Sequence, residues 1–185
     1  MKMYTPKLFY DTNAPMRHRK FEANDNKNEE WQASYTQLKK QYSQNGIIGL
    51  IGSRGCGKTQ ASVVMIALTT KNKKKALYTK TQEIFLSIRD AQGGGENGLM
   101  QTFNNYTDPH LLVIDAFQVR GGTEFEFRTL VSILDKRYDN MKPTILISND
   151  TAPEFIEAMG ADACSRMKEG GGIIQFNTTD FRGAK

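Results

Sequence analysis

A glycine-rich segment in the first third of the chain carries residue types suited to binding phosphate. Residues 52–59 fit the pattern G-x-x-x-x-G-K-[ST]. Glycines let backbone N–H groups close around phosphate oxygens, and the start of a following helix adds partial positive charge. We expect Lys58 to reach the β- and γ-phosphates of ATP, and Thr59 to hold Mg²⁺ through its hydroxyl. The predicted nucleotide-binding residues are Gly52, Ser53, Arg54, Gly55, Cys56, Gly57, Lys58, Thr59 and Gln60.

A second candidate lies about fifty residues further on, where the apolar run 111–115 (LLVID) ends in the carboxylate of Asp115. In proteins with a phosphate-binding loop, an acid at the end of such a strand, the Walker B aspartate, helps to hold Mg²⁺. An apolar strand ending in aspartate is common on its own. Downstream of the loop, it predicts that Asp115 and Thr59 share one metal ion.

The elements around these residues must be a strand before the loop and a helix after it. Residues 47–51 are apolar and predict the strand, whereas residues 61–68 predict a buried helix. This context distinguishes a phosphate-binding loop from a glycine-rich turn before an ordinary helix. Further strands are expected at 75–80, 111–115, 143–148 and 173–177, and further helices at 27–44, 81–91, 99–106, 124–138, 153–160 and 163–168. Strands alternating with helices indicate an α/β fold, a parallel sheet covered on both faces.

Size and composition limit the class of protein. The chain has 185 residues, 38% of them hydrophobic, which is enough for one domain with a sizeable core. No stretch is long and apolar enough to cross a bilayer, and residues 1–20 lack a signal-peptide core, so we expect a cytoplasmic protein without a membrane partner. Cys56 and Cys164 lie far apart, which argues against a structural disulfide.

Charge and aromatic patterning leave two alternatives open. The net charge of +5 would suit a polyanion, and the run 71–75 (KNKKK) is either a solvated loop or a contact for a phosphate backbone. In the predicted helix 27–44, four residues share one face: Trp31, Tyr35, Leu38 and Tyr42. That face either packs on the core or binds a partner.

From residue 14 onward the chain resembles the AAA+ helicase loaders of the DnaC and DnaI type and the related transposition ATPases of the IstB type. The resemblance is carried by residues 111–150, residues 163–182 and the segment APMRHRKFE at 14–22. It implies a P-loop NTPase fold with a five-stranded sheet of order 5-1-4-3-2 and no C-terminal lid domain. We expect an N-terminal extension and lead-in segment at 1–25 and the ATPase domain at 26–185.

The resemblance also implies roles for three polar residues. Asn149 takes the place of the sensor that polarises the attacking water or the γ-phosphate. Arg166, in the sequence SRM, matches the arginine finger that reaches the ATP of a neighbouring subunit, and Arg182 matches a second sensor. Fixed cations stabilise charge that develops on the γ-phosphate, and a finger acting in trans makes hydrolysis depend on assembly. The alternative for each arginine is a surface ion pair.

Ala116 is the main departure from the family, which has a glutamate immediately after the Walker B aspartate. That glutamate activates the attacking water, and alanine cannot do so. Asp115 should still support binding of Mg²⁺ and ATP, while hydrolysis should be severely slowed. The alanine fits a chain engineered to trap ATP, a natural ATPase-deficient protein, or rescue by a neighbour such as Glu124.

The loaders also carry a stretch after the Walker B strand that touches single-stranded DNA. Residues 118–125 occupy this position, and we expect contacts from Arg120, Thr123 and Phe125. Alternatively, Phe125 packs against the helix that follows. Only residues 1–13 precede the lead-in segment, where loaders place a helicase-binding domain, and their aromatic and apolar side chains could form a minimal docking peptide.

The leading hypothesis is an ATP-binding replication accessory protein of the helicase-loader type from a bacterial or phage-infected cell. It would assemble as an ATP-dependent homo-oligomer through Arg166 on single-stranded DNA and act with a replicative DNA helicase. A second hypothesis is an IstB-like ATPase that forms filaments on duplex DNA and recruits a transposase. A third is a regulatory module that binds nucleotide without motor activity.

Overall fold

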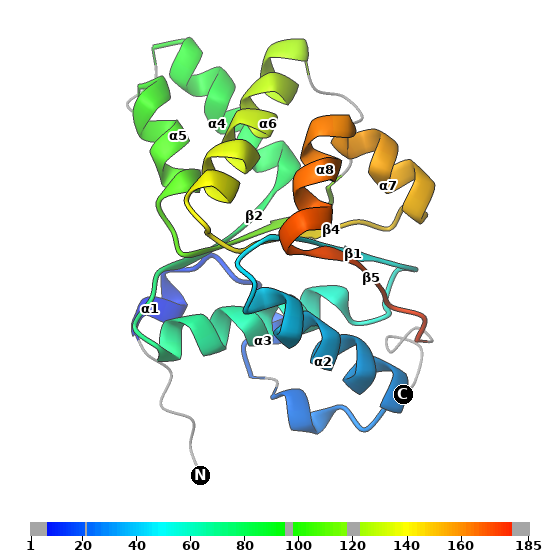
Figure 1. Cartoon of the computed structure of the whole chain (residues 1–185). Helices are drawn as coiled ribbons and strands as arrows, with labels where there is room; N and C mark the ends of the chain where they lie inside the picture. The colour runs from blue at the N-terminus through cyan, green and yellow to red at the C-terminus, as the bar shows by residue number, and fades with distance from the viewer. Residues whose placement is uncertain (1–6, 21, 95–97, 118–122, 179–185) are drawn as a thin grey trace.

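The chain forms a five-stranded parallel sheet with helices on both faces, as seen in a computed structural model that describes residues 7–20, 22–94, 98–117 and 123–178 (Figure 1). The strand order is β2-β3-β4-β1-β5, and all four neighbouring pairs run parallel. This is the predicted order 5-1-4-3-2 counted from the other edge, so the expected fold is confirmed. The strands are β1 (Ile47–Ile51), β2 (Ala76–Lys80), β3 (Leu111–Asp115), β4 (Thr144–Ile147) and β5 (Gly172–Gln175).

The helices divide into two layers, one on each face of the sheet (Figure 1). One layer holds α1 (Lys7–Tyr10), α2 (Glu29–Tyr42) and α3 (Lys58–Lys71). The other holds α4 (Thr81–Gln92), α5 (Leu99–Thr107), α6 (Glu124–Asp139), α7 (Ala152–Met159) and α8 (Ala161–Gly170). Each layer buries its own apolar cluster against the sheet, which explains why the central strands β1, β3 and β4 consist mainly of apolar residues. In the described part of the chain, no helix combines the length and the apolar character needed to cross a membrane.

Strand β1 shows how the two layers fix the position of the loop that follows it. Ile48 belongs to the cluster under α2 and α3, whereas Ile47 and Ile51 belong to the cluster on the opposite face. Between them, a Cβ atom on Gly49 would lie 2.6 Å from the ring of Phe155, so α7 packs directly on the strand backbone. The start of the glycine-rich loop is therefore held from both sides.

The described residues before α2 form short helical elements that pack against the core. Besides α1, they form short 3-10 helices at Met16–His18 and Ala23–Asp25. Phe9 is 1% exposed and joins the core, which corrects the expectation that it could belong to a docking peptide. The carbonyl of Thr12 accepts a hydrogen bond of 2.7 Å from the backbone N–H of Tyr78, so this segment covers part of the outer edge of β2. The proposed division of the chain at residues 25 and 26 stays a prediction.

Candidate functional site

The glycine-rich loop connects β1 to α3, and its path requires glycine at two positions. Gly52 has a φ of 136°, and a Cβ atom there would lie 2.3 Å from the carbonyl oxygen of Phe176. Gly57, the residue before the first turn of α3, has a φ of 93°. Side chains other than hydrogen are disfavoured in both backbone conformations. The loop therefore has the strand–loop–helix context that the sequence predicted.

Lys58 is 5% exposed and turns back over the loop. Its Nζ donates hydrogen bonds to the carbonyl oxygens of Gly52 (2.6 Å) and Ser53 (2.7 Å). It also donates to Oδ1 of Asn149, 3.1 Å away, just beyond the end of β4. The structure thus brings together the predicted phosphate-binding lysine and the predicted sensor, two residues far apart in the sequence.

Asp115 lies at the end of β3 within reach of Thr59. The Thr59 hydroxyl donates to Oδ2 of Asp115 over 3.1 Å, and the Ala116 backbone N–H donates to Oδ1 over 2.7 Å. A hydroxyl and a carboxylate are the oxygen ligands that Mg²⁺ takes beside nucleotide phosphates. These two side chains therefore fit the predicted metal.

Tyr78 is a member of this site that the sequence analysis did not identify. Its hydroxyl, on β2, donates to the same Oδ2 of Asp115. Burial, and then the charge of Asp115, raise the pKa of Tyr78 well above its usual range, so the hydroxyl stays a donor. The signal is visible only once β2 is known to pair with β3, where Lys80 lies opposite Asp115 and Tyr78 lies two residues earlier.

A cavity of about 610 Å³ opens beside the loop and joins it to the N-terminal segment. It is lined by Arg17, His18, Asp25, Asn26, Trp31, Arg54, Gly55, Gly57, Lys58, Thr59, Gln60, Asp115, Ile147 and Asn149. Nδ1 of His18 lies 2.6 Å from Oε1 of Gln60, and the indole N–H of Trp31 donates to the Gly57 carbonyl over 3.3 Å. These contacts fasten the residues before β1 to the glycine-rich loop. Trp31 also packs in the core, as predicted, where it stacks on Tyr35.

Residues after β5 donate hydrogen bonds to the glycine-rich loop and to the strand before it, a contact that the sequence did not indicate. The buried Thr178 hydroxyl donates to the Cys56 carbonyl over 2.7 Å. The Phe176 N–H donates to the carbonyl of Ile51 over 2.9 Å. A main-chain carbonyl of the loop is thereby fixed by a side chain more than a hundred residues away.

Ala116 has a left-handed backbone, with a φ of 52°, and an exposed side chain. Among the described residues that line the cavity, the carboxylates belong to Asp25 and Asp115. Glu124 is exposed and pairs with Arg128 within α6, so the structure gives no support to the idea that it replaces the missing glutamate.

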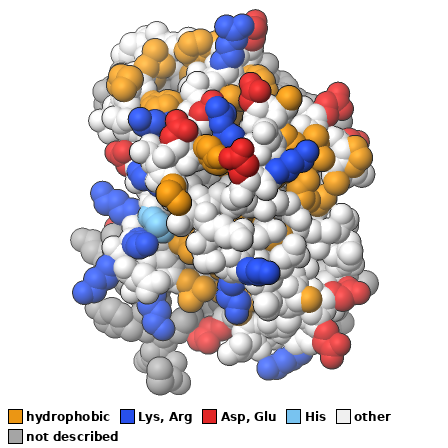
Figure 2. Space-filling model, in the orientation of Figure 1, with side chains coloured by type: hydrophobic (Ala, Val, Ile, Leu, Met, Phe, Trp, Pro, Cys, Tyr) orange, Lys and Arg blue, Asp and Glu red, His pale blue; other side chains and the backbone are white. Residues whose placement is uncertain are grey.

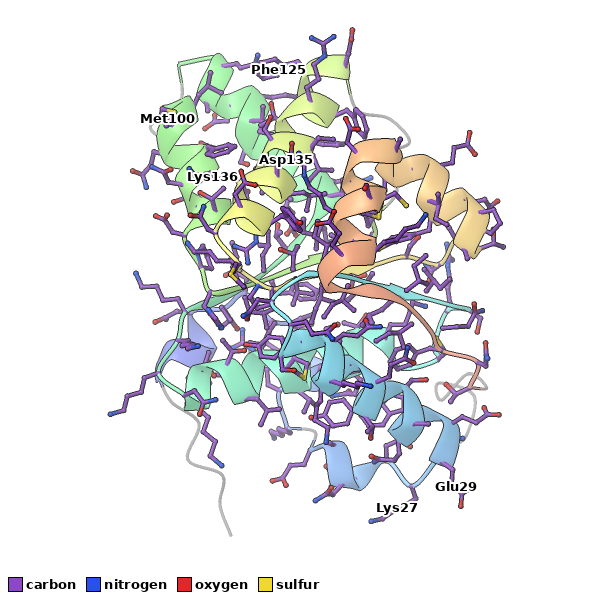
Figure 3. The ribbon with its side chains drawn as sticks, in the orientation of Figure 1. Lys27, Glu29, Met100, Phe125, Asp135 and Lys136 are labelled. Carbon is purple, nitrogen blue, oxygen red and sulfur yellow. The ribbon has the colours of Figure 1, made fainter. Side chains whose placement is uncertain are left out.

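Arg166 does not line the cavity of its own chain. It forms an ion pair with Asp135 of α6, which Figure 3 labels, and lies 5.9 Å from the centre of the Tyr138 ring. Neither Asp135 nor Tyr138 lines the nucleotide cavity. Arg182 lies outside the described residues, as does Arg120.

The two described residues of the predicted DNA contact lie at the start of α6. Thr123 caps this helix, because its hydroxyl accepts a hydrogen bond of 3.3 Å from the backbone N–H of Glu126. Phe125 lies at the end of α6 that is far from the sheet (Figure 3), and it is 43% exposed and so only partly packed. The carboxylate of Glu126 is buried and pairs with Arg89, which ties the start of α6 to α4.

Comparison with known proteins adds a family and a fold. The family described as IstB-like ATP binding protein matches residues 20–166. The replicative helicase loader DnaC of Escherichia coli strain K12 is 24% identical over 132 residues, which are 71% of this chain and 54% of that protein. The chain therefore spans about half the length of the curated relatives it matches.

Solved structures agree on the fold. A crystal structure of the DnaC helicase loader aligns with 92% of this chain and 99% of that one, with a TM-score of 0.70 and 17% identity. The replication initiator DnaA bound to AMPPCP and single-stranded DNA aligns with 90% of this chain and 52% of that one, with a TM-score of 0.70 and 19% identity.

Proposed function

Because the chain belongs to the family of IstB-like ATP-binding proteins, we propose that it is an ATP-binding replication accessory protein of the helicase-loader type. One observation carries this proposal: a single cavity is lined by Lys58, Thr59, Asp115 and Asn149. Lys58 and the loop N–H groups bind the phosphates, while Thr59 and Asp115 hold Mg²⁺. The metal supplies positive charge that neutralises the phosphate oxygens.

The nucleotide acts in this proposal as a switch for assembly. Ala116 cannot activate water, so the ATP-bound form persists long after it forms. Asn149 accepts a hydrogen bond from Lys58, and its amide group cannot take a proton from water in place of the missing glutamate. ATP then favours whichever assembly state it binds more tightly than ADP does.

Assembly depends on Arg166 reaching the nucleotide of a neighbouring subunit. Its position outside its own cavity supports this role, since a finger acting in trans must face another chain. Asp135 holds the arginine in the single chain and releases it when a stronger anion is offered. Phe125 stacks on the bases of single-stranded DNA beside Arg120 and Thr123, and its exposure supports this contact. A replicative DNA helicase is the proposed protein partner, and Arg182 is the second sensor.

The family description favours one alternative, an IstB-like transposition ATPase. Such a protein would form filaments on duplex DNA and act with a transposase. The nucleotide site would be the same in both cases, so DNA preference separates them.

The decisive experiment measures particle size by light scattering with Mg²⁺ and ATP, alone and with single-stranded or duplex DNA. We expect oligomers on single strands for the original chain and monomers for Arg166→Ala. The matched control is Arg128→Ala, which also removes an arginine paired with a carboxylate but faces solvent. Assembly on duplex DNA alone would favour the transposition ATPase. Monomers under all conditions, or equal loss in both variants, would contradict the proposed assembly.

A further inference from the structure

The edge of the sheet where the strands begin carries a cluster of cations that the nucleotide site does not use. Four exposed lysines lie between the last turn of α3 and β2: Lys71, Lys73, Lys74 and Lys75. Lys142 and His110 join them from the residues before β4 and β3. We call these six residues the basic edge. The glycine-rich loop follows the carboxyl end of β1, so the basic edge lies on the opposite side of the parallel sheet (Figure 1).

The lysine segment has a fixed backbone. The Lys73 and Lys74 N–H groups donate to the carbonyls of Thr70 (2.9 Å) and Thr69 (3.2 Å) at the end of α3. The carbonyl of Lys75 accepts from the N–H of His110 over 2.9 Å, which joins this segment to the one before β3. The first two bonds form a Schellman motif that ends α3, with Lys73 in the left-handed conformation, so the lysines that follow the helix start from a defined backbone position.

One buried guanidinium connects the segments of the basic edge from below. Arg137 of α6 is fully buried and donates to the carbonyls of Pro109 (2.8 Å), His110 (3.1 Å) and Pro143 (2.8 Å). Burial lowers the pKa of Arg137 to about 9, so it remains charged at neutral pH. It therefore organises the segments before β3 and β4 and adds a positive charge beneath them.

The pKa of His110 indicates that its surroundings are positively charged. Its pKa is lowered first by burial and then by the charges of Lys74, Arg137 and Lys142. Nε2 of His110 lies 3.3 Å from Nζ of Lys74, and the uncharged ring of Tyr42 from α2 lies edge-on to the imidazole. The charged groups that shift the pKa of this histidine are all cations, although Asp108 is only two residues away in sequence. The local charge is therefore positive, which favours contact with an anion.

We propose that the basic edge binds the phosphodiester backbone of a nucleic acid, at a contact separate from the nucleotide cavity and from Phe125. Figure 2 shows blue side chains gathered around a histidine on the left of the molecule, where α3 ends. Lysines bind phosphates as point charges without reading bases, and binding releases counterions from the strand. The contact therefore supplies affinity with little sequence preference. It does not depend on ATP or on assembly.

The test is the salt dependence of oligonucleotide binding for the chain carrying Lys71→Gln, Lys73→Gln and Lys74→Gln. The control carries Lys27→Gln, Lys39→Gln and Lys168→Gln, which removes equal charge from exposed positions outside the basic edge. Affinities for a single-stranded oligonucleotide and its duplex are measured between about 50 and 200 mM salt. For each lysine that contacts phosphate, the slope of log K against log salt should fall by about 0.7 on single strands or about 0.9 on duplex. The control should keep its slope, and the strand type with the larger change identifies the ligand.

A second readout is the pKa of His110, followed by NMR of its imidazole. A bound phosphate backbone should raise this pKa in the original chain, because the anion offsets Lys74, Arg137 and Lys142. Equal slopes for both triple variants, or a His110 pKa that nucleic acid leaves unchanged, would overturn the proposal. Binding to anionic vesicles but not to oligonucleotides would overturn it too. Binding of a fluorescent ATP analogue to the same samples tests the nucleotide site independently.

Discussion

Positive charge is used in opposite ways at the two ends of the parallel strands. We call the side where the strands end the carboxyl edge and the side where they begin the amino edge. At the carboxyl edge, Lys58 is buried and donates to acceptors in the glycine-rich loop and to Asn149, and Asp115 accepts from Thr59 and Tyr78. At the amino edge, Lys71, Lys73, Lys74 and Lys75 are exposed, and Lys142 is half-buried. A ligand of the first edge must replace internal hydrogen bonds with its own, so geometry decides which ligand binds. A ligand of the second edge needs only negative charge, so salt governs its affinity.

The largest expected effect tests whether a carboxylate at position 116 is the only group that the carboxyl edge lacks for ATP hydrolysis. Ala116→Glu should raise the rate of ATP hydrolysis by about 10²- to 10⁴-fold, the usual contribution of a general base. The left-handed backbone at residue 116 adds no new strain, because alanine already adopts it. Steady-state phosphate release measures the gain. The control Ala116→Gln has similar size without a carboxylate, and equal rates for the two variants would contradict the interpretation.

The next effect tests whether the amino edge depends on Arg137. Arg137→Met should lower the free energy of unfolding by about 3–5 kcal/mol, because the carbonyls of Tyr106 and Pro109 would lose the hydrogen bonds that the buried guanidinium now donates. Urea denaturation measures this loss. Lys136→Met, on the exposed neighbour, should cost little. Similar stabilities of the two variants would mean that Arg137 does not hold the edge together.

A smaller effect tests the contact between Tyr78 and Asp115. Tyr78→Phe should lower the free energy of unfolding by about 1.5 kcal/mol without ligand, since a hydrogen bond to a carboxylate is lost. If Mg²⁺ replaces this donor, the loss should shrink with Mg²⁺ and ATP bound, and apparent affinity should rise by about tenfold. Thermal unfolding with and without ligand measures both. A loss of equal size in the two states would show that tyrosine and metal do not compete.

The carboxyl edge was largely predictable because its main residues sit in short motifs. The run 52–59 and the strand ending at Asp115 carry their chemistry in consecutive residues, and alternation of strands and helices gave the class of sheet. The strand order came from resemblance to a family, since spacing alone does not determine which strands are neighbours. Asn149 was assigned in the same way, and its contact with Lys58 agrees with that position.

Other parts of the site could not be found in this way, because they arise from contacts between distant segments. Tyr78 resembles any strand residue until β2 is placed beside β3. Thr178 is an ordinary polar residue until its hydroxyl meets the carbonyl of Cys56. The lysine run 71–75 allows two interpretations from its sequence, and its position beside His110 and Lys142 favours the phosphate contact. The composition of residues 9–14 also does not predict that Phe9, Thr12 and Ala14 are buried.

The N-terminal segment that lies along strand β2 has a consequence for aggregation. β2 ends the sheet, and an uncovered edge strand offers its N–H and C=O groups to strands of other molecules. Here the carbonyl of Thr12 occupies the Tyr78 N–H, and Phe9 anchors the covering segment in the core. Residues 9–12 thus shield part of the edge strand, and we expect cleavage of this segment to expose β2 to pairing with other molecules.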